Sequence, residues 1–381
     1  RNVARLTGDE NASPVINLQT NFGGGKTHSM LALWHLASGA ESHVFGDDVA
    51  PLAKPLDAVR GRVGRVALVG NQMVPSRENT DDGRPTIRTM WGELAWQLGG
   101  QEAYDIVAHA DRTSTNPGAD LRELFTLYSP AVILIDEWVA YARQLVNPPE
   151  PLPAGDFDTQ FTFAQALTEA ARAVKGIQVV ISIPASSNGD GGDEVNDEEV
   201  GGEYGREALH ALKNVIGRTA DQWQPANAEE SFEIVRRRIF STPDAEASAK
   251  IANIAKNVVE FYRKYHAEFP SEVRDSQYED RIKRCYPIHP ELFDRLYQDW
   301  STLDRFQRTR GVLQMMNRVV GTLWRSDNSS ALIMPGTVPL DDADVVSEVT
   351  KYLEDQFKPV IHTDVAGPES VSALVDKNNE H

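Results

Sequence analysis

The sequence predicts an α/β fold in which helices flank a parallel sheet, followed by an all-helical domain. Apolar segments at 14–19, 65–70, 131–136 and 177–183 alternate with helical patterns over roughly the first 240 residues. Buried strands that alternate with helices are typical of a parallel sheet covered on both faces. From about residue 243 only helical periodicity follows. We expect a core of residues 1–242, a helical domain of residues 243–330, and the start of a further module in residues 331–381.

Each predicted helix rests on apolar residues at three- and four-residue spacing. In the core these helices lie near 26–37, 88–98, 119–128, 137–145, 159–174 and 206–216. Gly217 ends the last of them as a C-terminal cap, and "ADQWQ" after it is a candidate edge strand. Later helices are expected near 245–266, 289–300, 304–325 and 341–356.

The composition excludes several classes of protein. The chain has 381 residues, a formal net charge of −18 and one cysteine, Cys285. This charge argues against non-specific nucleic-acid binding by the bulk surface, because phosphate contacts need clustered Lys and Arg. No apolar run approaches the roughly 20 residues of a membrane span. We expect a cytoplasmic protein, and a fragment of a longer one because it begins at Arg1. Cys285 and His289 have metal-like spacing, but without a second pair a buried thiol is favoured.

A glycine-rich segment, "TNFGGGKTHSM" at 20–30, follows the first predicted strand and precedes a helix. In a phosphate-binding loop, backbone N–H groups close around the anion and the helix directs its positive end to it. Lys26 would reach the β- and γ-phosphates, and Thr27 would place its hydroxyl on Mg²⁺. The expected cofactor-binding residues are Asn21, Phe22, Gly23, Gly24, Gly25, Lys26, Thr27 and His28. Thr20 stands where the motif begins with glycine, so the loop alone does not exclude a glycine-rich turn.

The segment "AVILIDE" ends in two adjacent carboxylates, Asp136 and Glu137. Two adjacent carboxylates at the end of a buried strand indicate a site, because unpaired buried charges are costly. The alternative is that Asp136 only caps the helix that follows. With the loop, the pair favours a nucleotide site in which Asp136 holds Mg²⁺ and Glu137 orients and deprotonates water. No guanine-recognition motif follows, and Glu after the strand Asp indicates P-loop ATPases with an added strand between loop and acid. On the next strand, Ser182 is either a γ-phosphate contact or a satisfied hydroxyl.

Two arginines complete the candidate site. Arg310 falls on the apolar stripe of the helix at 304–325, where it needs an anion, either a structural carboxylate or a nucleotide phosphate. Arg218 follows the helix at 206–216. It is either an arginine finger that reaches a neighbouring subunit or a cation at a helix C-terminus.

Five blocks resemble the signature segments of a family of large prokaryotic ATP-binding proteins, domain-of-unknown-function family 499. They are "NFGGGKTH", "TMWGELAWQLGG", "VILIDEWVAYARQL", "YPIHPEL" and "FQRTRGVL", and the similarity spans about residues 14–365. The resemblance implies an AAA+-like P-loop core with a helical lid, and a role in phage defence, because the family is often encoded beside DNA methyltransferases in BREX-like islands. It assigns Lys26, Thr27, Asp136, Glu137 and Arg310 to the family's motifs.

We therefore expect an ATPase that uses ATP and Mg²⁺ and couples its nucleotide state to a partner protein or DNA. The expected partners are other subunits of a defence complex and further copies of the chain, with DNA reached through the full-length assembly. The alternative is a switch or scaffold that binds nucleotide without hydrolysing it. The acidic segment at 189–205 is either a solvated loop or a contact for a partner.

Overall fold

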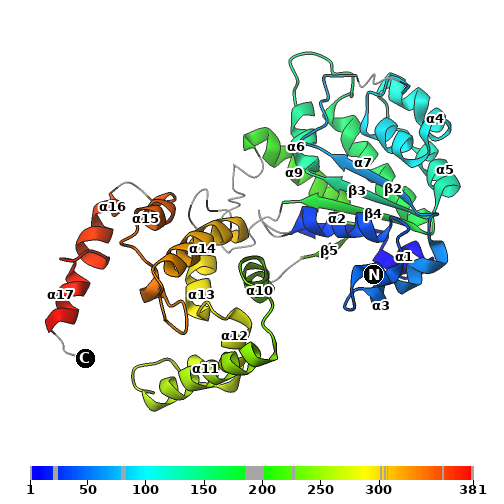
Figure 1. Cartoon of the computed structure of the whole chain (residues 1–381). Coiled ribbons are helices and arrows are strands. Elements are labelled where there is room, and N and C mark those ends of the chain that lie inside the picture. The colour runs from blue at the N-terminus through cyan, green and yellow to red at the C-terminus, as the bar shows by residue number, and fades with distance from the viewer. Residues whose placement is uncertain are drawn as a thin grey trace. The chain divides into compact units, whose positions relative to one another are not determined.

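The structure is a computed structural model (Figure 1) that describes residues 2–19, 25–78, 83–184, 201–224, 228–300, 303, 306, 308–353 and 356–378. The chain divides into two compact units, the first made of residues 1–21 and 25–225 and the second beginning at residue 226. The first unit is α/β and the second is built from helices. A membrane-spanning helix would need a longer apolar stretch than any helix has in the described part of the chain.

Parallel strands form the centre of the first unit, and they confirm the predicted sheet. Within the described residues the sheet contains β1 Val15–Gln19, β2 Gly64–Val69, β3 Ala131–Asp136, β4 Ile177–Ile183 and β5 Asp221–Trp223. The strand order is β2-β3-β4-β1-β5, so β4 is the added strand between β1 and β3, and β5 is an edge strand. Every residue of β3 and β4 is buried, which explains why both strands are mostly apolar, with Gln178 and Ser182 as the polar residues within β4.

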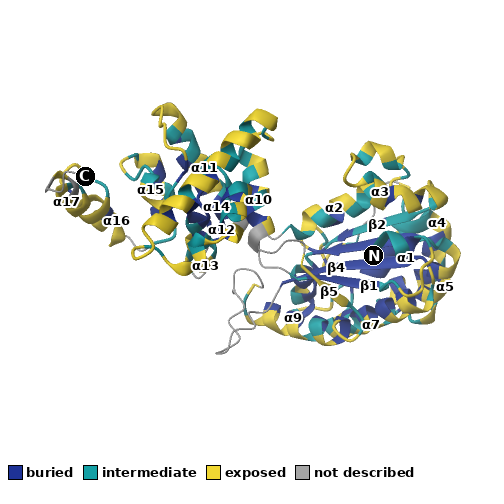
Figure 2. Ribbon diagram, turned by 90° about the horizontal axis from the view of Figure 1, so that it is seen from below, coloured by how far each residue is buried: buried dark blue, intermediate teal, exposed yellow. Residues whose placement is uncertain are grey.

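Helices cover both faces of this sheet (Figures 1 and 2). They are α1 Asn2–Leu6, α2 Lys26–Leu36, α3 Ala50–Ala53, α4 Met90–Thr113, α5 Ala119–Tyr128, α6 Trp138–Ala142, α7 Phe157–Ala173 and α9 Gly202–Ile216. One apolar core joins Ile133 and Ile181 to α4, α5, α6, α7 and α9. The other joins Val132 and Val180 to α1 and α2. Alternate residues of each strand thus enter different cores, as the two-residue period of a strand requires.

The helix predicted at 88–98 is the first half of α4. Gly99 and Gly100 leave the helical conformation, and a second half continues to Thr113. Gly99 also packs closely on Tyr128, since a Cβ there would lie 2.6 Å from the ring carbon Cζ. The glycine pair is therefore a kink rather than the end that the sequence suggests.

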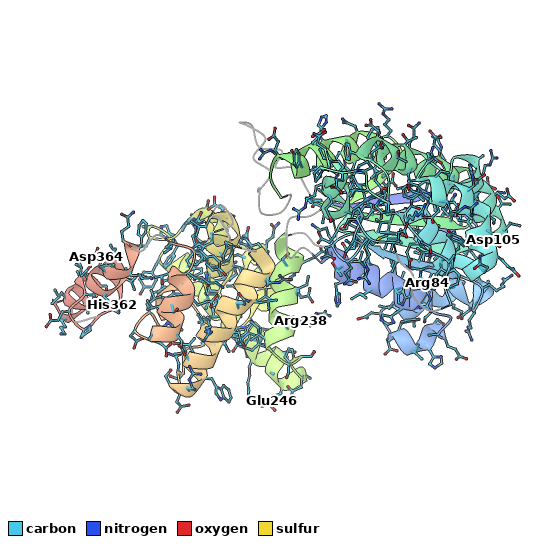
Figure 3. The ribbon with its side chains drawn as sticks, turned by 90° about the horizontal axis from the view of Figure 1, so that it is seen from above. Arg84, Asp105, Arg238, Glu246, His362 and Asp364 are labelled. Atoms are coloured by element: carbon cyan, nitrogen blue, oxygen red, sulfur yellow. The ribbon has the colours of Figure 1, made fainter. Side chains whose placement is uncertain are left out.

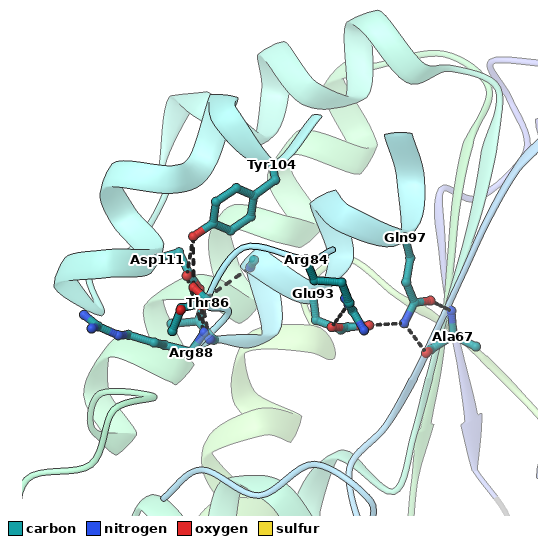
Figure 4. A network of polar contacts seen from close by, with 10 residues as sticks. Ala67, Arg84, Thr86, Arg88, Glu93, Gln97, Tyr104 and Asp111 are labelled. Atoms are coloured by element: carbon teal, nitrogen blue, oxygen red, sulfur yellow. Dashed lines mark hydrogen bonds and ion pairs between the residues drawn. The ribbon is translucent and has the colours of Figure 1, made fainter. Parts of the chain in front are cut away.

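Two polar networks involve α4 (Figure 4): one joins its two halves, and the other joins it to the sheet. In one, the Asp111 carboxylate accepts hydrogen bonds from the Thr89 hydroxyl at 2.6 Å and the Tyr104 hydroxyl at 2.9 Å. In the other, Arg84 contacts Glu93, which accepts from the Gln97 amide. Gln97 also bonds both the N–H and the carbonyl of Ala67 on edge strand β2. The amide of Gln97 thus takes the place of a neighbouring strand.

The second unit contains α10 Ala228–Ile239, α11 Ala245–Lys264, α12 Ser276–Cys285, α13 Pro290–Gln298, α14 Arg308–Arg325, α15 Ala343–Thr350, α16 Phe357–Val360 and α17 Val371–Asn378. Its main core joins α13 and α14 to Val235 of α10 and Val345 of α15. Side chains from before residue 242 and after residue 331 therefore share one core with the helices between them.

Charged side chains point outward from both units (Figure 3). Asp105 on α4, Arg238 on α10 and Glu246 on α11 are all exposed. Their exposure keeps these charges hydrated and avoids the desolvation free energy of burying an ionised group. A carboxylate that is withdrawn from water needs a separate explanation.

Candidate functional site

The candidate site lies at the edge of the sheet where the parallel strands end. There β1 leads toward α2, and β3 ends in Asp136. Only β4 lies between these two strands, so the two sequence motifs, far apart along the chain, meet in space. The contact is direct: the Thr27 hydroxyl donates to Oδ2 of Asp136 at 2.7 Å.

The described part of the glycine-rich segment lies at the start of α2. Gly25 is the residue before the helix and has a left-handed backbone with φ 82°, a conformation that glycine adopts without strain. Lys26 begins the helix, followed by Thr27 and the exposed His28. The N–H groups of a first helical turn have no acceptor within the helix, so the start of α2 suits an anion. Asn21, Phe22, Gly23 and Gly24, and the departure at Thr20, lie outside the described residues.

Asp136 is nearly buried but not fully used as an acceptor. Its side chain is 8% exposed. Besides the Thr27 hydroxyl, it accepts the backbone N–H of Glu137 at 3.1 Å. In the described residues no cluster of three or more His, Cys, Asp or Glu could hold a metal ion. A hydroxyl beside a carboxylate fits Mg²⁺, which takes few protein ligands and completes its shell with phosphate oxygens and water.

Glu137 has an unusual backbone and a perturbed carboxyl group. Its φ of 55° and ψ of 36° place it in the left-handed region, which a side chain of this kind seldom adopts and which often marks a functional residue. Burial raises the pKa of Glu137, and the Asp136 carboxylate raises it further. Lys26 and Arg143 act in the opposite direction. A carboxyl with a raised pKa is a better proton acceptor when ionised, as general bases require.

Two residues that the sequence analysis did not single out adjoin Glu137. The first, Gly70, follows β2 and donates its N–H to the Asp136 carbonyl at 2.8 Å. The second, Arg143, follows α6 and lies across the backbone of Gly201, where a Cβ would be 2.5 Å from the guanidinium carbon. Gly70 is the last residue of the predicted strand at 65–70, and a glycine at a strand end was the available signal. Nothing in the sequence indicates that Arg143 and Gly201 meet.

Ser182 lies at the level of the acid pair. Ile135 of β3 is paired with Ile181 of β4, so Asp136 and Ser182 come next on adjacent strands. Ser182 is 2% exposed and is paired with Leu18 of β1 on its other side. The position suits the predicted γ-phosphate contact, and its role stays a prediction.

Both predicted arginines are exposed, which differs from expectation for Arg310 alone. Arg218 is exposed after α9, which ends at Ile216 as predicted, and its role as an arginine finger stays a prediction. Arg310 is also exposed, so its placement on a buried stripe is wrong. The fully buried residues of α14 include Val312, Met316 and Val319. The helix is rotated from the predicted stripe, and Arg310 falls beside its buried face.

Comparison with known protein families gives two matches that together cover nearly the whole chain. Residues 1–222 match the DUF499 N-terminal domain, and residues 226–380 match the DUF499 second domain. The chain therefore belongs to the DUF499 family, as the sequence blocks predict. No curated protein and no solved structure matches it.

Proposed function

We propose that this member of the DUF499 family binds ATP with Mg²⁺ and hydrolyses it. The observation that carries the proposal is the 2.7 Å hydrogen bond between Thr27 and Asp136. A hydroxyl from the start of a helix and a carboxylate from the end of a buried strand form a pair of hard oxygen ligands beside an anion-binding helix terminus. This combination suits a metal-bound polyphosphate.

Each residue then has a chemical role. Lys26, at the start of α2, neutralises the β- and γ-phosphates together with the backbone N–H groups. Thr27 and Asp136 hold Mg²⁺, which supplies charge neutralisation to the phosphates when bound. Glu137 orients the attacking water and accepts its proton. Ser182 contacts the γ-phosphate. Arg218 and Arg310 supply positive charge, Arg218 from a neighbouring copy of the chain.

Hydrolysis, rather than binding alone, is favoured by Glu137. A residue that served only to hold nucleotide would gain nothing from a left-handed backbone beside a second carboxylate. That arrangement costs stability and raises the pKa of a carboxyl group, which are both features of catalytic residues.

We further propose that the nucleotide state is passed to a partner, either another subunit of a defence complex or DNA held by the full-length protein. The family resemblance is the support for this step. A cytoplasmic location in an assembly with further copies of the chain belongs to the same proposal.

The test measures ATP binding and hydrolysis with Mg²⁺ for the wild-type chain, Lys26→Ala, Glu137→Gln and the exposed-lysine control Lys54→Ala. Lys26→Ala should lose both binding and turnover. Glu137→Gln should retain binding and lose turnover by at least about 10²-fold, as for removal of a general base. Lys54→Ala should match the wild type. Normal turnover in Glu137→Gln would remove the catalytic role of that residue.

Protein concentration separates the ATPase from the non-hydrolysing switch. Turnover that rises more than linearly with concentration, and that Arg218→Ala abolishes, would support a site completed between copies. ATP binding that Lys26→Ala removes, without turnover at any concentration, would favour the switch. Absence of ATP binding would refute both functions.

A further inference from the structure

Strand β2 ends directly against the backbone of Glu137. The last residue pair of the β2–β3 ladder joins Val69 to Asp136. Gly70 extends it by donating its N–H to the Asp136 carbonyl at 2.8 Å. This bond brings the Gly70 Cα beside the peptide that follows Glu137.

The space at position 70 excludes any side chain. A Cβ there would overlap the Glu137 carbonyl oxygen, lie 2.8 Å from its carbonyl carbon and lie 3.1 Å from the Tyr141 Cβ. The first two atoms belong to the backbone, so no rotamer change can make room. The φ angle of Gly70 lies outside the left-handed region, so glycine is needed here for space and not for conformation.

The backbone of Glu137 is held from two directions. Its N–H donates to the Asp136 carboxylate at 3.1 Å, and its carbonyl lies against Gly70. The peptide units on both sides of the Glu137 Cα are therefore fixed, and with them the left-handed conformation and the direction of the Cα–Cβ bond.

We propose that Gly70 is a positioning residue for Glu137, an inference that rests on the proposed ATPase function. Because glycine has no side chain, the end of β2 packs directly against the Glu137 peptide. This packing fixes the Glu137 backbone and so positions its carboxylate in the site. A methyl group at position 70 would displace that peptide. Displacements of about 1 Å at a reacting group are enough to cost on the order of 10²-fold in rate.

The matched control is Gly64→Ala, at the opposite end of the same strand. Gly64 also donates its N–H to the chain beside β3, to the Pro130 carbonyl at 2.8 Å. A Cβ at Gly64 would meet the terminal Cδ1 of Leu98 at 3.0 Å, a flexible group that can move. Gly64→Ala therefore changes the same strand without touching Glu137.

The first measurement needs no enzymatic activity. The ¹³Cα and ¹³Cβ signals of Glu137, which report its backbone conformation, are recorded by NMR in the nucleotide-free chain with labelled glutamate, and Glu137→Gln assigns them. Gly70→Ala should move both signals away from their left-handed positions, and Gly64→Ala should leave them unchanged. Identical signals in Gly70→Ala and the wild type would overturn the role of Gly70, whether or not the chain hydrolyses ATP.

The second measurement separates positioning from a structural role. Gly70→Ala should lower kcat by at least about 10-fold while the Kd for ATP stays within about 2-fold of wild type. Equal loss of ATP binding and turnover would overturn the proposal. If Gly70→Ala does not fold, the contact is tested from the other side: Glu137→Gly must shift the Gly70 amide signal and leave the Gly64 amide signal unchanged. An unshifted Gly70 amide would overturn the proposal. Absence of turnover in the wild type refutes the ATPase alone.

Discussion

Two buried aspartates in the first unit have opposite surroundings. Asp111 is fully buried and accepts from the Thr89 and Tyr104 hydroxyls and from the backbone N–H groups of Arg88 and Thr89. Asp136 is 8% exposed, accepts from Thr27 and the Glu137 N–H, and stands next to a second carboxylate. A carboxylate surrounded by donors is built into the fold. One that retains acceptor capacity beside like charge suits the ligand-binding role that we propose for Asp136.

The environment of Asp111 also fixes its donors. Burial raises the pKa of Tyr104 to about 12, and the Asp111 carboxylate adds to the effect. Tyr104 therefore stays protonated and continues to donate at any physiological pH. Within the described residues, Asp136 has no buried tyrosine donor of this kind, and its partner Thr27 is an exposed residue.

The largest expected effects come from replacing each aspartate with asparagine, which should lower ATP turnover at one position and stability at the other. Asp136→Asn should lower ATP turnover by about 10²–10³-fold, because it removes a charged ligand of the site, with little change in stability. Asp111→Asn should lower the free energy of unfolding by about 3 kcal/mol, because an amide NH₂ would face the donors of Thr89 and Tyr104. Urea unfolding and ATP turnover of both variants check the contrast. A reversed pattern would contradict the division between structural and functional carboxylates.

A buried histidine in the second unit extends the comparison to acid. His289 is 4% exposed, accepts from the Glu291 N–H at 3.1 Å through Nδ1, and contacts the Tyr262 hydroxyl at 2.9 Å through Nε2. Burial lowers the pKa of His289 to about 4 from 6.5. Protonation of Nδ1 would break the contact with Glu291, so the folded state favours the neutral ring.

Because this folded pKa is lowered, the stabilisation is complete above about pH 6.5 and is lost as the pH falls toward 4. The free energy of unfolding of the second unit should fall by about 3 kcal/mol over this pH range. Urea unfolding at pH 7 and pH 4.5 checks it, with His289→Asn as the control that should lose less stability between the two pH values. An equal loss in both proteins would exclude His289 as the cause.

A smaller effect is expected at Arg143. Because Arg143 is the least of the influences on the pKa of Glu137, Arg143→Gln should raise that pKa only modestly. The acid limb of the kcat–pH profile should therefore move to higher pH. Arg143→Lys keeps the charge and should stay close to the wild-type profile. A shift to lower pH in Arg143→Gln would contradict the electrostatic role.

The smallest effect is expected at the edge of the sheet. Gln97→Ala removes the partner of the Ala67 N–H and carbonyl and should lower the free energy of unfolding by about 1 kcal/mol. Gln101→Ala, on an exposed part of α4, is the control that should change it little. Chemical unfolding of the two variants gives the comparison.

Much of the fold follows from local sequence. The runs "AVILID" and "IQVVISI" are β3 and β4 because only strands buried on both faces are continuously apolar. The loop and the acid pair were predictable because each follows a strand, and the ends of parallel strands share an edge. The kink at Gly99 was harder to predict, because glycine ends a helix as readily as it bends one.

The remaining parts depend on contacts that no local pattern encodes. Arg310 is exposed because the buried face of α14 is set by its neighbours in the second unit. Gly70 and Arg143 approach Glu137 only once β2, β3 and α9 have assembled. Single glycines and arginines carry little periodic signal, so sequence analysis passes over them.

The left-handed backbone of Glu137 has a consequence for laboratory evolution. At φ 55° a glutamate costs about 1 kcal/mol more than a glycine, and asparagine is tolerated better than most residues. Glu137→Gly should therefore release backbone strain and remove a buried charge beside Asp136. A library selected only for heat resistance would enrich such substitutions, and its survivors would be the most robust and least active proteins. Any selection for a sturdier version of this chain must score ATP turnover in the same round.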